Sequence, residues 1–362
     1  MILQTAKYVS LVAIIFFWVV QAEWSQYIQR HNAFNKPYML TWINHSTLSV
    51  YFIFACCYVK YHGVQLNGGK EKIYSISEYL NNFGFTVKKY IYQGIFFGLL
   101  YLVPNALYFY ALGYGSSVGI ATTIFNTNIA AAYVFSVLLL NEAVTMKKSL
   151  GVLLCIVGTF LVSVLAKPDQ PIQFDGMDLV TFSAALLFGL WEVLYKKFAV
   201  GGDSPTILLL FIYGSYGLAH LFLFWIFMWP LNALKIEIFQ LPSLDQFKLI
   251  FLNMFLATSF NCSFFTALAL IDSPVLVSIA CLLTIPATTL VDYILFQQLL
   301  STFEIVGGIM IIIGFLLFSV AITNDDNQEE VDDIKNQIYE EETGRDTDNL
   351  MNNNSNVNYR KL

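Results

Sequence analysis

Long apolar stretches alternate with short polar segments along most of this chain. The hydrocarbon core of a bilayer is about 30 Å thick, and a helix needs roughly 20 apolar residues to cross it. Ten stretches meet this requirement, each bounded by charge, glycine or proline. They lie near residues 7–26, 37–61, 90–112, 117–140, 147–166, 177–198, 206–229, 246–269, 273–297 and 302–322. We therefore predict an all-α polytopic membrane protein with ten transmembrane helices.

Composition strengthens this prediction and sets the C-terminal segment apart. Of the 362 residues, 57% are hydrophobic and 12% are charged, whereas soluble domains carry about 25% charged residues. Residues 323–362 are instead acidic and rich in asparagine, with few apolar side chains to offset the entropic cost of ordering. We predict that this segment is a disordered tail outside the membrane.

The distribution of lysine and arginine predicts the orientation, because positive residues concentrate in cytoplasmic loops. If the N-terminus is cytoplasmic, the inside loops and helix ends hold ten of these residues and the opposite side holds five. The inside set is Lys7, Lys60, Lys70, Lys72, Lys88, Lys89, Lys147, Lys148, Lys196 and Lys197, and the outside set is Arg30, Lys36, Lys167, Lys235 and Lys248. Both termini, and with them the tail, are therefore expected in the cytoplasm.

An internal repeat appears when the sequence is compared with itself at an offset of 156 positions. The segment 100–166 then matches the segment 256–322 without a gap. Identical pairs include Asn105 with Asn261, Phe109 with Phe265, Ser117 with Ser273, Gly151 with Gly307, and Gly158 with Gly314. The match covers the third to fifth and the eighth to tenth predicted helices, so the repeating unit has five helices.

A five-helix unit used twice divides the chain into a first repeat at 1–166, a second repeat at 167–322 and the tail at 323–362. Because five is odd, the second copy is inverted in the membrane. Inverted repeats are the basis of alternating-access transporters, which hold their substrate near the bilayer midplane between the two halves.

The first apolar stretch has an alternative interpretation. Lys7 precedes it, and Val20, Gln21 and Ala22 would suit signal-peptide cleavage. Cleavage would leave nine helices and break the matched pair of five. We therefore expect the first helix to be retained.

Three segments carry a resemblance to a known family. They are KPYMLTW (Lys36–Trp42), WEVLYKKF (Trp191–Phe198) and TIPATTLVDY (Thr284–Tyr293). With the ten helices, the inverted repeat and the polar tail, they resemble the drug/metabolite transporter superfamily (EamA-like), and solute carrier family 35, subfamily F, is the most similar branch. The FYN and GALNK motifs of the nucleotide-sugar branch are missing from the seventh to ninth helices. A nucleotide sugar is therefore a poor candidate substrate.

The resemblance implies a secondary carrier in an organelle membrane that moves a polar organic solute, either a thiamine-like cation or a nucleotide-type metabolite. The tail contains DTDNLM and ends in YRKL, and both resemble short signals that vesicle-coat adaptors bind. These signals favour a vacuolar, lysosomal or Golgi-type membrane.

Two carboxylates are candidate substrate ligands, because ionisable groups inside a membrane are costly and need a reason. Glu192, near the cytoplasmic end of the sixth helix, either pairs with Lys196 one turn later or lines a cavity and binds a cation or proton. Glu23, near the end of the first helix, is either an interface anchor beside Trp24 or a second cavity carboxylate. In an inverted repeat, the two carboxylates would lie at opposite mouths of one cavity.

Amide and hydroxyl side chains supply further candidates. Asn105 and Asn261 occupy matched positions within apolar helices, where they either bond to neighbouring helices or contact solute near the pseudo-twofold axis. In IFNTN of the fourth helix we prefer Asn128 over Asn126 as a solute ligand. The repeat partner of Asn128 is Thr284, which is also polar.

Two more ionisable side chains lie within predicted helices. Asp292, toward the non-cytoplasmic end of the ninth helix, either coordinates a cationic group or contacts headgroups and backbone amides. His45 lies well inside the second helix, and a lone histidine there is more often a hydrogen-bonded core residue than a proton relay.

The repeated glycines predict a packing surface. Gly151 and Gly158 lie two turns apart on one face of the fifth helix, as do Gly307 and Gly314 on the tenth. Small residues let helix backbones approach closely. These faces are therefore expected to pack on other helices or to form a homodimer, and not to line the pathway.

The sequence shows no constellation typical of an enzyme. Four scattered histidines form no catalytic set, and the five cysteines contain no CxxC pair, so we predict neither catalysis nor a metal or other cofactor. The expected partners are a small-molecule solute, a coupling proton or ion, and the lipid bilayer, with no role for nucleic acid. A secondary active transporter working by alternating access is the leading hypothesis. A non-transporting receptor or scaffold with the same fold is the alternative.

Overall fold

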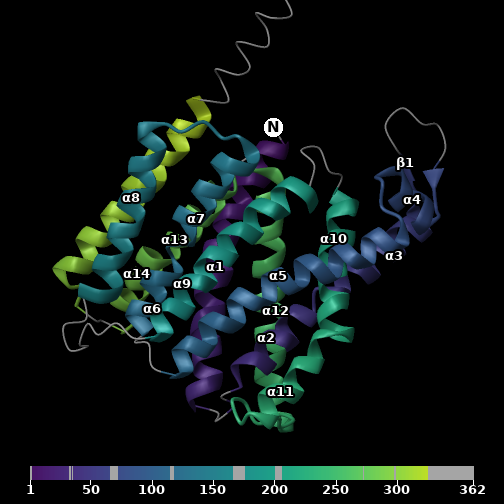
Figure 1. Cartoon of the computed structure of the whole chain (residues 1–362), viewed down its shortest axis with the longest axis horizontal. Coiled ribbons are helices and arrows are strands. Elements are labelled where there is room, and N and C mark those ends of the chain that lie inside the picture. The colour runs from purple at the N-terminus through teal and green to yellow at the C-terminus, as the bar shows by residue number, and fades with distance from the viewer. Residues whose placement is uncertain are drawn as a thin grey trace, which may run out of the picture.

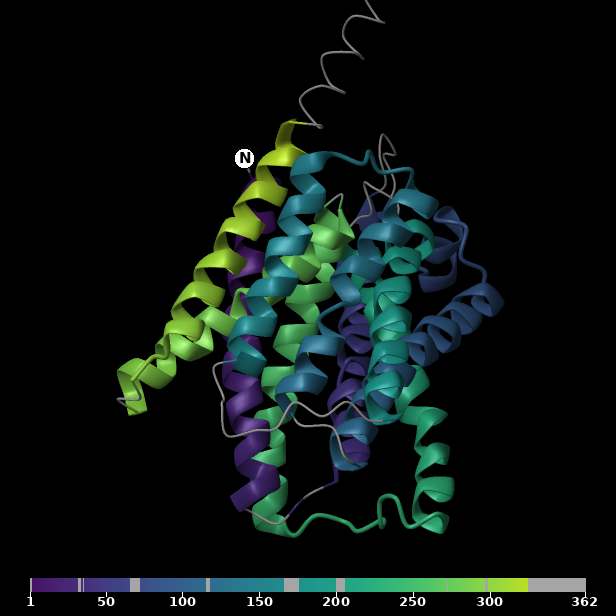
Figure 2. The same ribbon diagram turned by 60° about the vertical axis from the view of Figure 1, so that its left-hand side comes forward.

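The computed structural model describes residues 2–31, 34, 36–65, 72–114, 118–165, 176–199, 206–271, 273–296 and 299–324. Nearly all of these residues are helical, and the helices pack side by side in one bundle (Figures 1 and 2). The predicted tail lies outside the described residues from position 325 onward.

Helices and one small sheet make up the first half of the chain. The helices are α1 (Ile2–His31), α2 (Pro37–Ser46), α3 (Ser49–His62), α4 (Ile76–Asn82), α5 (Val87–Tyr114), α6 (Val118–Phe125), α7 (Asn128–Phe135), the π-helix η1 (Ser136–Leu140), α8 (Met146–Phe160) and the π-helix η2 (Leu161–Leu165). The strands β1 (Val64–Gln65) and β2 (Lys72–Ile73) pair antiparallel between α3 and α4. This sheet and α4 lie at one edge of the bundle (Figure 1).

The described residues of the second half are mostly helical and contain no strand. Its elements are α9 (Gly176–Leu194), the π-helix η3 (Tyr195–Ala199), α10 (Thr206–Phe222), the 3-10 helix η4 (Phe224–Phe227), α11 (Met228–Ala233), α12 (Leu244–Leu270), α13 (Pro274–Leu282), α14 (Thr284–Phe296) and a last helix at Thr302–Asn324. The last helix is the yellow one in Figures 1 and 2.

Six helices in the described part of the chain are long and apolar enough to cross a membrane. A seventh is added if α10 and the segment after its 43° bend count as one span. The structure is therefore that of a polytopic all-α membrane protein. The predicted total of ten spans stays a prediction.

Three of the predicted apolar stretches are interrupted at a threonine. Breaks separate α2 from α3, α6 from α7, and α13 from α14. At each break a threonine hydroxyl donates a hydrogen bond to the backbone carbonyl three residues earlier. These bonds join Thr47 to Asn44 (2.6 Å), Thr127 to Ile124 (2.6 Å) and Thr284 to Cys281 (2.5 Å). The hydroxyls give the backbone a local partner where the helix stops, and an apolar surrounding requires such a partner.

The repeated glycines bring α8 and the last helix into backbone contact. A Cβ atom at Gly151 would lie 2.9 Å from the carbonyl oxygen of Gly314, and one at Gly158 would lie 2.6 Å from that of Gly307. The packing prediction is therefore confirmed. The glycine faces cover each other within one chain. A homodimer through these two helices stays a prediction.

Helix α10 packs on α3 at a second close approach. A Cβ atom at Gly214 would lie 2.5 Å from the backbone nitrogen of Phe52, and one at Gly217 would lie 1.9 Å from that of Ser49. A backbone nitrogen cannot move aside as a flexible side chain can. Residue 217 therefore has to be glycine for these two helices to meet.

We expect Gly217→Ala to lower the free energy of unfolding by about 3 kcal/mol, because the added methyl group overlaps the backbone of α3. Gly176→Ala is the matched control, since a Cβ there meets nothing within 4 Å. Thermal unfolding of both variants in detergent measures the difference. Equal stability of the two variants would contradict the close approach.

Candidate functional site

Glu192 is a fully buried carboxylate in the middle of the bundle, with 0% of its surface exposed. Its Oε2 accepts a 2.6 Å hydrogen bond from the hydroxyl of Ser278 on α13. Its Oε1 has no hydrogen-bond partner among the described residues. The side chain therefore points into the protein and away from the surface.

The alternative in which Glu192 pairs with Lys196 is wrong. The ammonium of Lys196 donates instead to the backbone carbonyl of Ala269, at 3.2 Å. The physical reason lies in the backbone, because α9 ends at Leu194 and residues 195–199 form the π-helix η3. A π-helix turns less per residue than an α-helix, so the residue four positions later no longer stacks over Glu192.

Both lysines of WEVLYKK cap the ends of other helices. Lys196 bonds near the C-terminus of α12, and Lys197 donates a 2.6 Å hydrogen bond to the carbonyl of Leu139 near the end of η1. Cations are favourable at helix C-termini, where unpaired carbonyls and the negative end of the helix dipole meet. The two lysines therefore tie α9 to two neighbouring segments.

An aromatic cluster surrounds Trp191, the residue before Glu192. Trp191 lies with its ring centroid 4.5 Å from that of Tyr101, and it stacks on Phe264 at 6.2 Å with an interplanar angle of 10°. Phe188 and Phe265 complete the contact, at 5.5 and 5.7 Å from Trp191. Residues of α5, α9 and α12 build this cluster, and one of its members, Tyr101, interacts electrostatically with Glu192.

Tyr101 connects two of the predicted asparagines. Its hydroxyl donates a 3.0 Å hydrogen bond to Oδ1 of the buried Asn261. Asn105 donates from Nδ2 to the carbonyl of Tyr101 one turn earlier on the same helix, at 2.8 Å. Asn261 therefore belongs to the polar interior around Glu192, whereas Asn105 bonds within its own helix.

Asn128 and Thr284 lie at the two matched helix breaks. Asn128 is buried at the start of α7, and its carbonyl oxygen would lie 2.7 Å from a Cβ atom at Gly189, one turn before Glu192. Thr284 is buried at the start of α14, after the break that follows α13. Both residues thus lie where a predicted span is interrupted, and Asn128 also contacts α9.

The remaining two predicted carboxylates cannot be placed. The side chains of Glu23 and Asp292 lie outside the described residues, although their backbones belong to α1 and α14. Their predicted roles stay predictions.

The sequence missed a second buried polar group, a histidine pair. Nδ1 of His45 on α2 lies 3.3 Å from Nε2 of His220 on α10, and both side chains are buried. The lone-residue interpretation of His45 as a hydrogen-bonded core side chain is thus supported. His220 gave no signal in the sequence, because only the fold brings it to His45.

Glu237 fixes the end of the bundle that holds α11. Its two carboxylate oxygens accept hydrogen bonds from the backbone nitrogens of Tyr38 (2.7 Å) and Met39 (2.9 Å) in the first turn of α2. Burial raises the pKa of Glu237, and these two bonds and the charge of Lys36 offset part of that rise. The carboxylate therefore supplies the N-terminal cap that Lys36 does not give α2.

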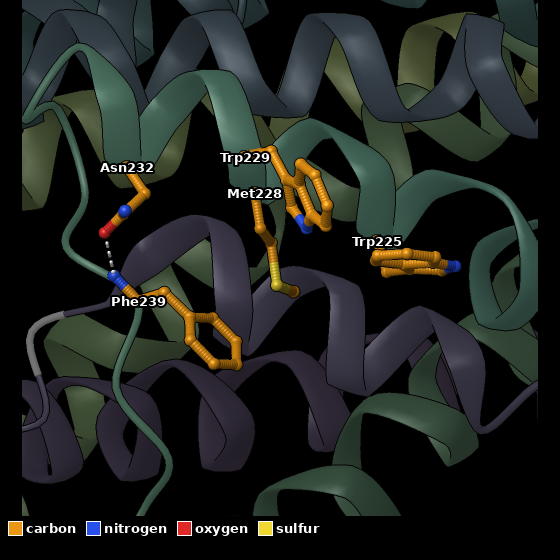
Figure 3. A pocket seen from close by; sticks show the side chains of 5 residues that line it. All are labelled: Trp225, Met228, Trp229, Asn232 and Phe239. Carbon is orange, nitrogen blue, oxygen red and sulfur yellow. Dashed lines mark hydrogen bonds between the residues drawn. The ribbon is translucent and has the colours of Figure 1, made fainter.

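A cavity of about 370 Å³ lies beside α11 (Figure 3). It is lined by Trp225, Met228, Trp229, Asn232 and Phe239, and Asn232 accepts a 2.9 Å hydrogen bond from the backbone nitrogen of Phe239. None of the predicted site residues lines it. Its lining is mostly apolar, with partly exposed tryptophans of the kind found at membrane interfaces.

The fold and the buried carboxylate define a polytopic membrane protein with a polar interior. Comparisons with known proteins indicate the class of membrane protein. Residues 8–164 match the EamA-like transporter family. Because this family and the transporters described next agree, the drug/metabolite transporter superfamily predicted from the motifs is supported, and the chain is a membrane transporter and not an enzyme. Membership of subfamily F stays a prediction.

Two fungal proteins are similar over most of the chain. The "Thiamine-repressible mitochondrial transport protein THI74" of Saccharomyces cerevisiae is 25% identical over 333 residues, covering 85% of this chain and 89% of its own. The "Uncharacterized transporter C405.03c" of Schizosaccharomyces pombe is 26% identical over 333 residues, covering 85% and 94%. A crystal structure of a protein with 14% identity aligns with a TM-score of 0.60 over 88% of this chain and 97% of its own, and it supports the fold alone.

We expect Glu237→Ala to lower the free energy of unfolding by about 2 kcal/mol, because two amides at the start of α2 lose their acceptor. Glu237→Gln keeps one acceptor oxygen, so it should lose about half as much. Asp245→Ala removes an exposed carboxylate and should change stability by less than about 0.5 kcal/mol. Thermal unfolding in detergent checks this order, and equal losses for all three variants would contradict the cap.

Proposed function

We propose that this chain is a secondary active transporter that moves a polar organic cation across an organelle membrane by alternating access. The observation that carries the proposal is Glu192, which is buried and makes no ion pair with any described residue. A lone charge in a membrane interior costs about 2.5 to 3.5 kcal/mol on insertion scales, so such residues mark substrate or ion sites. The charge is neutralised when a cation or a proton binds.

The surroundings of Glu192 favour a thiamine-like cation over a nucleotide-type metabolite. Tyr101 interacts electrostatically with Glu192 and packs on Trp191, which stacks on Phe264, and aromatic faces attract organic cations. A nucleotide carries phosphate, which requires arginine or lysine ligands. Lys196 and Lys197, the nearest lysines along the chain, bond to helix ends instead.

Alternating access rests on the inverted repeat, and three observations support that arrangement. The glycine contacts are reciprocal, because Gly151 meets the repeat partner of Gly158, and Gly158 meets the repeat partner of Gly151. The two helix breaks fall at matched positions, since Thr127 and Leu283 differ by the repeat offset. In the repeat, α1 corresponds to α9 and α5 corresponds to α12. The contact of α1 with α12 therefore corresponds to the contact of α9 with α5, and both are present.

The two ends of the bundle carry contacts that alternating access has to break in turn. Lys196 and Lys197 hold α9 to the ends of α12 and η1, and Glu237 holds the segment after α11 to α2. The Lys197–Leu139 bond and the Glu237 bonds each join the second repeat to the first, so rocking one half against the other would separate them, whereas the Lys196 bond stays within the second repeat. In the proposed cycle, one set opens while the other stays closed.

The location and the coupling ion are part of the proposal. We place both termini in the cytoplasm, on the lysine distribution, and we expect coupling to a proton. One relative is named as mitochondrial, which does not support a vacuolar, lysosomal or Golgi-type membrane for this chain. A receptor or scaffold with this fold is the competing function, and it would bind a solute without moving it.

We expect purified protein in proteoliposomes to exchange labelled thiamine across the membrane and to exchange nucleotides at least about tenfold more slowly. Glu192→Gln removes the charge and keeps the shape, so it should reduce thiamine exchange at least about tenfold. Glu78→Gln, at an exposed glutamate of α4, is the matched control and should retain full exchange.

Two outcomes would contradict this prediction. Thiamine that binds to the protein without crossing the membrane would favour the receptor. Full exchange by Glu192→Gln would remove the carboxylate from the site.

A further inference from the structure

His45 and His220 are joined in a defined order of hydrogen bonds. Nδ1 of His220 lies 2.8 Å from the backbone carbonyl of Tyr216. A carbonyl oxygen accepts hydrogen bonds and cannot donate them, so Nδ1 of His220 carries a hydrogen. In the neutral ring, Nε2 of His220 then has a lone pair that faces His45.

That lone pair fixes the tautomer of the second ring. Nδ1 of His45, 3.3 Å from Nε2 of His220, has to carry a hydrogen and donate it. The other nitrogen of His45, Nε2, keeps the only basic lone pair of the pair. Both histidines are thus Nδ1–H tautomers, and together they have one place for a proton.

The surroundings of the pair suit a single positive charge. The ring of Tyr101 on α5 lies 4.8 Å from His45, and the ring of Phe224 in η4 lies 4.9 Å from His220. Aromatic rings at this distance stabilise a cation. Of the other helices packed on α2 and α10, α3 and α12 place no titratable side chain in contact with either ring within the described ranges.

We propose that His45 and His220 form a one-proton site that competes with the cation at Glu192. A proton adds to Nε2 of His45, and the hydrogen on Nδ1 of His45 can pass to Nε2 of His220, so one charge is shared. A second proton would place two like charges on rings whose facing nitrogens lie 3.3 Å apart, which is unfavourable.

Tyr101 separates the pair from the carboxylate. Its ring centroid lies 4.8 Å from that of His45 on one side and 4.5 Å from that of Trp191, the neighbour of Glu192, on the other. Charges act strongly on each other across such an apolar layer. A proton on the pair therefore weakens cation binding at Glu192, and this second step rests on the proposed function.

The proton site itself can be tested without any transport. The full chain, labelled with ¹⁵N-histidine and reconstituted in lipid nanodiscs, contains four histidines, and His45→Gln and His220→Gln assign the signals of interest. We expect two Nδ1–H tautomers with a scalar coupling between the two ring nitrogens. Between about pH 8 and about pH 4, the pair should take up one proton.

The exposed His62 provides the matched control, because His62→Gln should leave both signals and their coupling unchanged. Nε2–H tautomers, separate uptake of two protons, or no uptake over this range would each overturn the proton site. The wild-type spectrum alone gives these outcomes, so the test stands even if a variant fails to fold.

Thiamine binding to the same nanodiscs tests the competition. We expect affinity to fall at least about tenfold as the pH is lowered, because both Glu192 and the histidine pair take up a proton. His45→Gln and His220→Gln should lose the part of this dependence that comes from the pair, while His62→Gln keeps all of it. An unchanged pH dependence in both pair variants overturns the competition. If thiamine binds at no pH, the proposed function fails and the competition with it, whereas the spectra still decide the proton site.

Discussion

The backbone hydrogen bond sets the main constraint on this structure, because an unpaired carbonyl or amide in hydrocarbon costs several kcal/mol. Helices that stop inside the apolar bundle therefore need substitute partners. Thr47, Thr127 and Thr284 supply them at the three breaks, each by bonding three residues back. Lys197 does the same at the end of η1, and Glu237 does it at the start of α2. These polar side chains of the spans therefore serve mainly as hydrogen-bond partners for backbone groups at helix ends.

The same breaks explain why Glu192 lies where it does. Helix α9 packs on the interrupted pair α6 and α7, with Gly189 against the carbonyl of Asn128, and Glu192 reaches the hydroxyl of Ser278 on α13 of the second interrupted pair. Discontinuous helices are where membrane transporters place polar groups near the midplane, since irregular backbone and small polar side chains provide partners there. Glu192 needs such partners, and a continuous apolar helix would offer it none. The helix breaks and the carboxylate thus belong to one arrangement.

Features that depend on the regular spacing of apolar and small residues could be predicted from the sequence. The helix ranges and the packing of Gly151 and Gly158 follow from apolar length and from small residues two turns apart. The pairing of Glu192 with Lys196 failed because η3 changes the helical repeat, and nothing in WEVLYKK signals a π-helix. The His45–His220 contact was equally out of reach, since it joins residues 175 positions apart and depends on how α2 meets α10.

The charges on Glu192, His45 and His220 depend on one another. Glu192 makes no ion pair with a described residue, and neither do His45 and His220, so these three groups together are neutral only with a proton or cation on the carboxylate and none on the imidazoles. A cation that leaves Glu192 creates a bare buried charge, which a proton then neutralises. A proton on the histidine pair creates the opposite excess and favours a vacant, ionised Glu192. Because Tyr101 and Trp191 keep the two sites apart without screening them, each occupant is felt by the other. Proton binding at the pair and solute binding at Glu192 are therefore coupled through their charges, and the only motion required is that of the helices that expose these two sites.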